Sequence, residues 1–241
     1  MCRETNRSVR EEMYFGGKGL NVSFVLKQLG TDSRALGFTG LAIEQSVTEA
    51  GVNADFVRLE QGFSRINVKV KSGEETELNG QGPDIPPAAL EELFRKLDSI
   101  QDGDKLVLAG SVPASLPSDI YEQILARLSC RNIRTVVDAS KDLLKNVLKY
   151  RPFLVKPNNH ELGELFGVKL TTLEEISEYA AKLRQMGSRN VLVSMAGNGA
   201  LLLDKNGTQH SCGVCRGGGA QLSRRGGFHG RGLPRGAGQG V

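Results

Sequence analysis

Long apolar stretches are missing from this chain of 241 residues. No apolar run approaches the roughly 20 residues that a membrane-spanning helix needs. The N-terminal residues MCRETNRSVREEM also lack the apolar centre of a secretory signal peptide. We therefore expect a cytoplasmic protein with no membrane partner.

Cysteine is scarce. Of the four cysteines, Cys2 and Cys130 lie far apart, while Cys212 and Cys215 form a single C-x-x-C motif. A tetrahedral metal site needs a second pair of ligands, and no second pair is present. The cysteines therefore give little support for a metal or redox site, and we expect no direct metal ligands among them.

Acidic residues are absent from residues 216–241, which hold five arginines and ten of the 30 glycines. Subtracting these five charges from the net charge of +4 leaves −1 for the rest of the chain, which has no basic bias toward nucleic acid. The composition changes near residue 212. RNA-binding Arg/Gly segments usually carry repeated RGG units with aromatics, whereas this one has Phe228 and no repeat. The sequence favours no nucleic-acid partner.

From residue 105 onward, short apolar runs alternate with amphipathic helical patterns. The apolar runs are KLVLAG, RTVVDA, PFLVKP and NVLVSM. This alternation predicts one α/β domain with a mostly parallel, doubly wound sheet that helices cover on both faces. Such sheets bind ligands beyond the carboxyl ends of their strands, where this sequence reads GSVP, SKD, NNHE and AGNG.

Residues 63–82 interrupt this pattern. Ile66, Val68 and Val70 alternate with polar residues before a Ser-Gly turn and a polar return strand. This predicts a small β-hairpin with one face exposed to water. Because such insertions commonly carry function, we interpret the hairpin as a lid or a dimer surface.

The stretch FGGKGLNVSFVLKQLG places a glycine-rich turn directly before an amphipathic helix. Gly16, Gly17 and Gly19 let the backbone approach a ligand closely, and Lys18 adds a cation beside the free N–H groups of the helix start. This combination suits a phosphorylated or hydroxylated small molecule, although a plain tight turn explains the residues equally well. The spacing fits neither a P-loop nor a dinucleotide-binding motif.

Four motifs occur in an order and at a spacing that resemble one enzyme family: GGKGLNVSFVLKQLG, LNGQGP, KPNNHELGELFG and VLVSMAGNGALLLD. From about residue 6 to residue 207, the chain is similar to the ribokinase-like sugar kinases of the phosphofructokinase B type. Its GGKG form, with AGSVPASLP, resembles 1-phosphofructokinases, with tagatose-6-phosphate kinases as near neighbours. The resemblance implies transfer of a phosphoryl group from ATP to fructose 1-phosphate with Mg²⁺, and it allows a homodimer through the lid.

The resemblance also implies roles for individual residues. Gly16, Gly17 and Asn21 would line the sugar site, while Lys18 and Arg65 would bind the phosphate that the substrate already carries. A planar guanidinium can hold a phosphate through two hydrogen bonds, which suits Arg65 on a lid. The alternative for Arg65 is a solvated hairpin residue.

The nucleotide side of the site is implied by the later motifs. Asn158 and Glu161 match the family's N-x-x-E, in which a carboxylate organises Mg²⁺ and water around the nucleotide phosphates. The same two residues suit a helix N-cap with its capping-box glutamate, and both roles can hold together. We interpret His160 as a surface residue, because the family gives it no role as a general base. The nucleotide-binding positions of the family correspond to Lys156, Ser194, Gly197 and Gly199.

Two parts of the family's pattern are missing. Its catalytic base is an aspartate in a G-A-G-D motif whose N–H groups form an anion hole, and no G-A-G-D occurs in this chain. Family members also begin with a strand that carries a substrate-contacting aspartate, whereas this chain opens at MCRETNRS. We expect an incomplete kinase domain over residues 1–212, a non-native, disordered tail over 213–241 and no normal activity. The alternative is a pseudoenzyme that binds sugar phosphate without turnover.

A change of reading frame accounts for the tail. When residues 221–236 are written in codons that the genetic code permits and read one base later, they give NSVGAGDSMVAGFLAG. That string resembles the missing motif, including its aspartate. We therefore expect a single-base insertion or deletion upstream, between about residues 207 and 221, as a sequencing error or a real frameshift.

Overall fold

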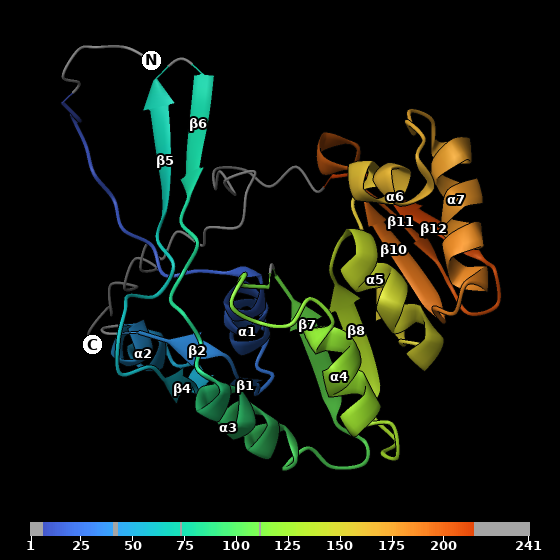
Figure 1. The fold of residues 1–241 in the computed structure, drawn as a ribbon. Coiled ribbons are helices and arrows are strands. Elements are labelled where there is room, and N and C mark those ends of the chain that lie inside the picture. Colours follow the sequence, from blue (N-terminus) through green and yellow to red (C-terminus); the bar gives the residue numbers. More distant parts are fainter. Residues whose placement is uncertain (1–6, 41–42, 73, 111, 215–241) are drawn as a thin grey trace, which may run out of the picture.

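The computed structural model describes residues 7–40, 43–72, 74–110 and 112–214, which form one central sheet, three small two-stranded sheets and the helices around them (Figure 1). The predicted tail beyond residue 214 lies outside the described residues. The first half of the chain contains α1 (Lys18–Gln28), β1 (Arg34–Ala35), β2 (Phe38–Thr39), α2 (Ile43–Glu49), β3 (Asn53–Ala54), β4 (Val57–Arg58), β5 (Asn67–Ser72), β6 (Glu74–Asn79) and α3 (Pro87–Leu97). The second half contains β7 (Lys105–Ala109), α4 (Ile120–Arg127), β8 (Arg134–Asp138), α5 (Lys141–Val147), η1 (Leu148–Tyr150), β9 (Leu154–Val155), α6 (Asn159–Phe166), α7 (Leu173–Gln185), β10 (Asn190–Ser194), η2 (Ala196–Asn198), β11 (Ala200–Leu203) and β12 (Gln209–Cys212).

The central sheet has the strand order β12-β11-β10-β9-β8-β7. Strands β7 to β10 run parallel to their neighbours, while β11 and β12 continue the sheet antiparallel. The four apolar runs that predicted parallel strands are β7, β8, β9 and β10. The α/β fold with a mostly parallel sheet is therefore confirmed, and the loops after these four strands meet at one edge of the sheet.

Helices α4, α5, α6 and α7 pack against one another in chain order, and α7 also contacts β10 and β11. The strand side chains buried with this helical layer include Val137, Val155, Val191 and Val193, none of which exposes any surface. Each such side chain stabilises the fold by about 1.5–3 kcal/mol through burial. Alternate strand positions are less covered, and Val107 on β7 is 36% exposed. One face of the described sheet is thus dry and the other is partly open.

Helix α1 connects the small sheets to the central one. It contacts both β1 and β7, and its Leu20 and Phe24 pack on a small core of Ala35, Val47 and Val52. This packing sets the start of α1, and with it the glycine-rich turn, beside the first strand of the central sheet.

The predicted hairpin is present as β5 and β6, which pair antiparallel with Val68 opposite Leu78 and extend away from the rest of the molecule (Figure 1). Its apolar side chains are open to water: Ile66 is 65% exposed and Leu78 is 62% exposed. In the part of the chain that the structure describes, no helix is long and apolar enough to span a bilayer.

Candidate active site

A cavity of about 540 Å³ opens beyond the carboxyl ends of β7 and β8. Two cationic side chains from distant segments, Lys18 and Arg65, line it together. Asp138, the last residue of β8, and residues that follow the two strands complete its wall, among them Gly110, Val112, Pro113 and Ser140. A smaller cavity of about 420 Å³, near Lys27 and Asp32, contains none of the predicted site residues. We therefore take the larger cavity as the candidate site.

Lys18 is held at the cavity by the glycine-rich turn. Gly17 precedes the first residue of α1 with φ 125°, a conformation that side-chain-bearing residues rarely adopt. A Cβ on Gly17 would meet no atom within 4 Å, so the backbone angle rather than lack of space requires glycine there. Gly16 and Gly17 are exposed, and the N–H of Asn21 donates to the carbonyl oxygen of Gly17 at 2.9 Å. The three predicted sugar-site residues thus lie in or next to the turn that presents Lys18.

Arg65 stands where the chain enters the hairpin, and two glycines on the returning strand lie against this entry. A Cβ on Gly80 would come within 2.7 Å of the carbonyl oxygen of Ile66. Gly82 has φ 88°, and a Cβ there would lie 3.5 Å from Cβ of Arg65. The motif LNGQGP therefore has a structural reason, because its glycines let the return strand pass beside the arginine.

Asp138 is a site residue that the sequence reasoning did not single out. Its Oδ1 lies 2.9 Å from Nζ of Lys18 and its Oδ2 lies 3.1 Å from Nζ of Lys156. One carboxylate at the end of β8 thus contacts the predicted phosphate-binding lysine and a predicted nucleotide-binding lysine. The available signal was the aspartate in RTVVDA, a charged residue at the end of an apolar strand.

Tyr121 lies behind this carboxylate on α4. Its hydroxyl donates to the carbonyl oxygen of Gly110 at 3.2 Å. Burial, with a smaller effect from the charge of Asp138, raises the pKa of Tyr121 to about 12. The phenol therefore stays neutral at physiological pH and acts as a hydrogen-bond donor to the loop after β7.

The N-x-x-E motif forms a capping box at the start of α6. The N–H of Glu161 donates to Oδ1 of Asn158 at 2.8 Å, and the N–H of Asn158 donates to Oε2 of Glu161 at 2.8 Å. Asn158 also pairs with Ser194 through an isolated parallel β-bridge. The structural role expected for the motif is confirmed, and it brings Asn158 next to one of the predicted nucleotide residues.

The two glycines predicted for the nucleotide site, Gly197 and Gly199, lie at the turn between β10 and β11. Gly199 has φ 88°, and a Cβ there would come within 2.0 Å of the carbonyl oxygen of Cys212. Around Gly197, by contrast, a Cβ would meet nothing within 4 Å. Gly199 is therefore needed for packing against β12, whereas Gly197 faces open space in which a ligand could approach the backbone.

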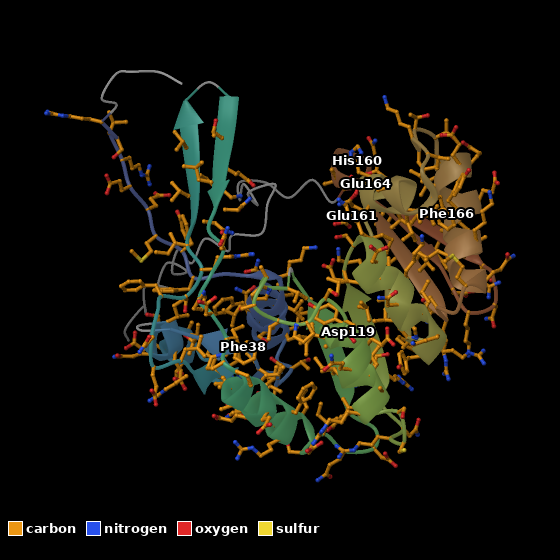
Figure 2. All side chains as sticks on the ribbon, viewed as in Figure 1. Phe38, Asp119, His160, Glu161, Glu164 and Phe166 are labelled. Carbon is orange, nitrogen blue, oxygen red and sulfur yellow. The ribbon has the colours of Figure 1, made fainter. Side chains whose placement is uncertain are left out.

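His160 and Glu164 lie with Glu161 on α6, near the end of the sheet that carries the loops (Figure 2). His160 is exposed, as expected for a surface residue. The residues predicted for the site therefore form two groups, one around Lys18 and Arg65 and one around Asn158 and Ser194, and the contacts of Asp138 with Lys18 and Lys156 connect the two.

A Mg²⁺ ion, which the motifs imply, fits Glu161. The capping box uses Oε2 of this half-buried carboxylate, and Oε1 takes no part in the box. Among the described residues, no three His, Cys, Asp or Glu side chains gather into a metal cage. Mg²⁺ commonly keeps several waters and binds one or two carboxylates plus substrate phosphates, so a single glutamate suffices.

Two cationic side chains, Lys18 and Arg65, beyond the strand ends of a mostly parallel α/β sheet form an arrangement that suits proteins of the class that binds phosphorylated small molecules. The family model described as pfkB family carbohydrate kinase matches residues 2–214. The chain therefore belongs to the pfkB family, as its motifs predicted.

Individual relatives agree. Bacillus subtilis 1-phosphofructokinase is 46% identical over 201 residues, which cover 82% of this chain and 66% of that protein. Bacillus licheniformis D-tagatose-1-phosphate kinase is 37% identical over 208 residues, with 84% and 68% covered. The chain thus spans about two thirds of the length of these relatives. The B. licheniformis enzyme is named for tagatose 1-phosphate, whereas the motifs of the sequence resembled those of tagatose-6-phosphate kinases.

Solved structures support the ribokinase-like fold. Escherichia coli phosphofructokinase-2 in complex with fructose-6-phosphate superposes with a TM-score of 0.76 at 25% identity, covering 89% of this chain and 73% of that one. The tetrameric inhibited form of the same enzyme gives a TM-score of 0.77 at 25% identity, with 88% and 72% covered. The E. coli enzyme thus binds a sugar phosphate in one structure and is a tetramer in the other.

Proposed function

We propose that this chain carries the binding sites of an ATP-dependent 1-phosphofructokinase, the enzyme that converts fructose 1-phosphate to fructose 1,6-bisphosphate. The observation that carries the proposal is that Lys18 and Arg65, from segments far apart in sequence, line one cavity beyond the strand ends. Two cations facing one cavity suit the dianionic phosphate of a sugar phosphate. The B. subtilis relative supports fructose 1-phosphate over other sugars.

In this proposal, the residues that line the cavity bind the sugar phosphate. Arg65 and Lys18 hold the phosphate at one end of the sugar, and Gly16 and Gly17 let the backbone approach its hydroxyl groups. The apolar wall of Val112, Pro113, Leu116 and Leu143 excludes water.

The nucleotide binds beside the cavity rather than in it, along Lys156, Ser194, Gly197 and Gly199. Glu161, with Asn158 beside it, would hold the Mg²⁺, which when bound would neutralise charge on the nucleotide phosphates. ATP and sugar phosphates are cytoplasmic metabolites, so we place the protein in the cytoplasm.

Binding is tested by calorimetry on the purified full chain. We expect saturable binding of fructose 1-phosphate, weaker binding of fructose 6-phosphate and tagatose 6-phosphate, and little binding of free fructose. Tagatose 1-phosphate is the informative competitor, because it carries its phosphate at the same position as fructose 1-phosphate. No binding of any of these sugar phosphates would contradict the proposal.

We propose further that the chain as printed binds without normal turnover. The phosphoryl transfer needs a group that takes the proton of the acceptor hydroxyl and N–H groups that stabilise the transferred phosphoryl, and the sequence lacks the G-A-G-D motif that supplies both in the family. An ADP-release assay measures this, and turnover of roughly 10 s⁻¹, a common enzyme value, would refute it. Sequencing the coding DNA across residues 205–241 tests the reading-frame hypothesis. Codons whose shifted reading lacks G-A-G-D would contradict it.

A second copy of the chain is the partner that we propose for the hairpin. Val68 and Val70 alternate along β5, Ile66 directly precedes this strand at the same spacing, and Leu78 pairs with Val68, so these exposed apolar side chains share one face. A dimer would cover them. Light scattering should give the mass of a dimer for the chain and a shift toward monomer for Val68→Lys/Leu78→Lys. A monomeric parent chain would contradict the proposal.

A further inference from the structure

Asp138 forms ion pairs with two lysines that belong to different ligand sites. Lys18 begins α1 and Lys156 follows β9, and their Nζ atoms lie 2.9 Å and 3.1 Å from the two oxygens of this one carboxylate. We propose that Asp138 is a positioning residue that holds Lys18 for the sugar phosphate and Lys156 for the nucleotide before either ligand binds. This inference rests on the proposed function for what the two lysines bind.

The carboxylate is well placed to act as an anchor. Asp138 is the last residue of β8, where it pairs in register with Ala109 of β7. The N–H of Lys156 donates to the carbonyl oxygen of Val137 at 2.9 Å, so the backbones of the anchor and of one lysine are joined as well. The side chain of Asp138 is 13% exposed, against 49% for Lys18 and 36% for Lys156. A fixed carboxylate therefore holds two flexible, more exposed ammonium groups.

A purely stabilising role does not explain this arrangement. Ion pairs whose cations are this exposed contribute little to folding stability. Direct metal binding by Asp138 is also disfavoured, because a divalent cation there would be repelled by the two ammonium groups that lie 2.9 Å and 3.1 Å from its oxygens. The bridge that Asp138 forms between Lys18 and Lys156 does fix the direction of their two four-carbon side chains, which would otherwise sample many rotamers.

Two effects compete when the carboxylate is removed. The site gains one unit of positive charge, which by itself attracts phosphate. Both lysines, however, lose their orientation and must be ordered by the ligand. Salt does not remove the charge effect at separations below the Debye length of about 8 Å, but the ammonium groups are partly in water, whose high dielectric constant weakens it. We therefore expect the loss of orientation to dominate and Asp138→Asn to weaken each ligand about threefold to tenfold, the range for ordering one long side chain.

The first experiment tests whether Asp138 affects the affinity for each ligand through the lysine proposed to bind that ligand. Calorimetry on the full chain measures fructose 1-phosphate and Mg·ATP in the parent, Lys18→Ala and Lys156→Ala backgrounds, each with and without Asp138→Asn. With Lys18→Ala, Asp138→Asn should no longer affect fructose 1-phosphate but should still weaken ATP. With Lys156→Ala, the pattern should reverse. Effects that persist in both backgrounds, or tighter binding of both ligands, would overturn the inference.

The matched control is Asp98→Asn. Asp98 also accepts from a basic side chain through both oxygens, at 2.7 Å and 2.5 Å from Arg127, but it lies at the end of α3 and does not line the cavity. Asp98→Asn changes the net charge by the same amount as Asp138→Asn and should leave the affinities for fructose 1-phosphate and Mg·ATP unchanged. A loss equal to that of Asp138→Asn would show a general charge effect and refute the positioning role.

The second experiment tests the bridge without ligand. The chain is labelled with ¹³C-methyl groups on its lysines, and the Lys18 and Lys156 signals are assigned from their Lys→Arg variants. Asp138→Asn should move both signals, whereas Asp98→Asn should move neither. Unmoved signals overturn the bridge even if the parent chain binds both ligands. A parent chain that binds neither ligand overturns the proposed function, and with it the role of the bridge in binding, while the signals still report whether the bridge exists.

Discussion

Arg65 offers a direct test of how the cavity selects its ligand. Arg65→Ala removes a guanidinium that lines the cavity beside Lys18 while leaving the glycines of the hairpin base in place. A charged hydrogen bond contributes about 1.5–3 kcal/mol when it is shielded from water. Arg65 is exposed, so solvent screening reduces its contribution to about 1 kcal/mol. That corresponds to about a fivefold weaker Kd for fructose 1-phosphate.

Free fructose has no phosphate for the guanidinium to bind, so its weak affinity should not change. Calorimetry measures the affinity for fructose 1-phosphate, and saturation-transfer NMR measures the affinity for free fructose. Arg58→Ala is the matched control, because Arg58 is an exposed arginine that pairs with Glu44 at 2.5 Å and does not line the cavity. Arg65→Lys should recover part of the loss, since it keeps the charge without the planar fork. Equal losses for fructose and fructose 1-phosphate would show that Arg65 does not bind the phosphate.

Three further substitutions test the nucleotide side and the core. Gly199→Ala should lower the free energy of unfolding by about 2 kcal/mol or more, because this residue has a positive φ and a Cβ on it would meet the carbonyl oxygen of Cys212. The control Gly197→Ala should lower it by less than about 1 kcal/mol, and urea denaturation measures both. Equal costs would contradict this packing. Asn158→Ala should lose about 1 kcal/mol with its capping box, as should Thr172→Ala in the matching box on α7, but only Asn158→Ala should weaken Mg·ATP. If both leave Mg·ATP unchanged, Asn158 is a cap alone. The pKa of Tyr121 is about 12 in the folded chain, above its ordinary value of about 10. The neutral phenol therefore stabilises the fold fully below about pH 10, and this stabilisation, on the order of 2 kcal/mol, is lost as the pH rises toward 12. Urea denaturation against pH should show a flatter alkaline decline for Tyr121→Phe, and an unchanged decline would refute the assignment.

Much of the fold was predictable because local patterns and tertiary packing agree. The apolar runs that became β7 to β10 are short, rich in valine and separated by amphipathic helices, and each lies in the sheet as expected. The hairpin at residues 67–79 was predictable for the same reason, since its alternation has a period of two.

The site was only partly predictable. Lys18 and Arg65 could be assigned separately from their motifs, but that they line one cavity depends on how α1 and the hairpin base pack against the central sheet. The contacts of Asp138 with Lys18 and Lys156 could not be predicted, because the two lysines lie at sequence separations from it that no local pattern encodes. Gly199 shows the same limit, since its need for glycine arises from a strand that comes later in the chain.

The partly open face of the central sheet bears on how this chain would behave in a cell. Valine and leucine side chains at alternate positions of a parallel sheet are normally covered, and Val107 on β7 keeps 36% of its surface in contact with water. Apolar surface that stays open to water is what folding chaperones bind and what favours aggregation at micromolar concentrations. The yield of soluble chain, and its co-purification with chaperones, would then be governed by this face before ligand affinity has any influence.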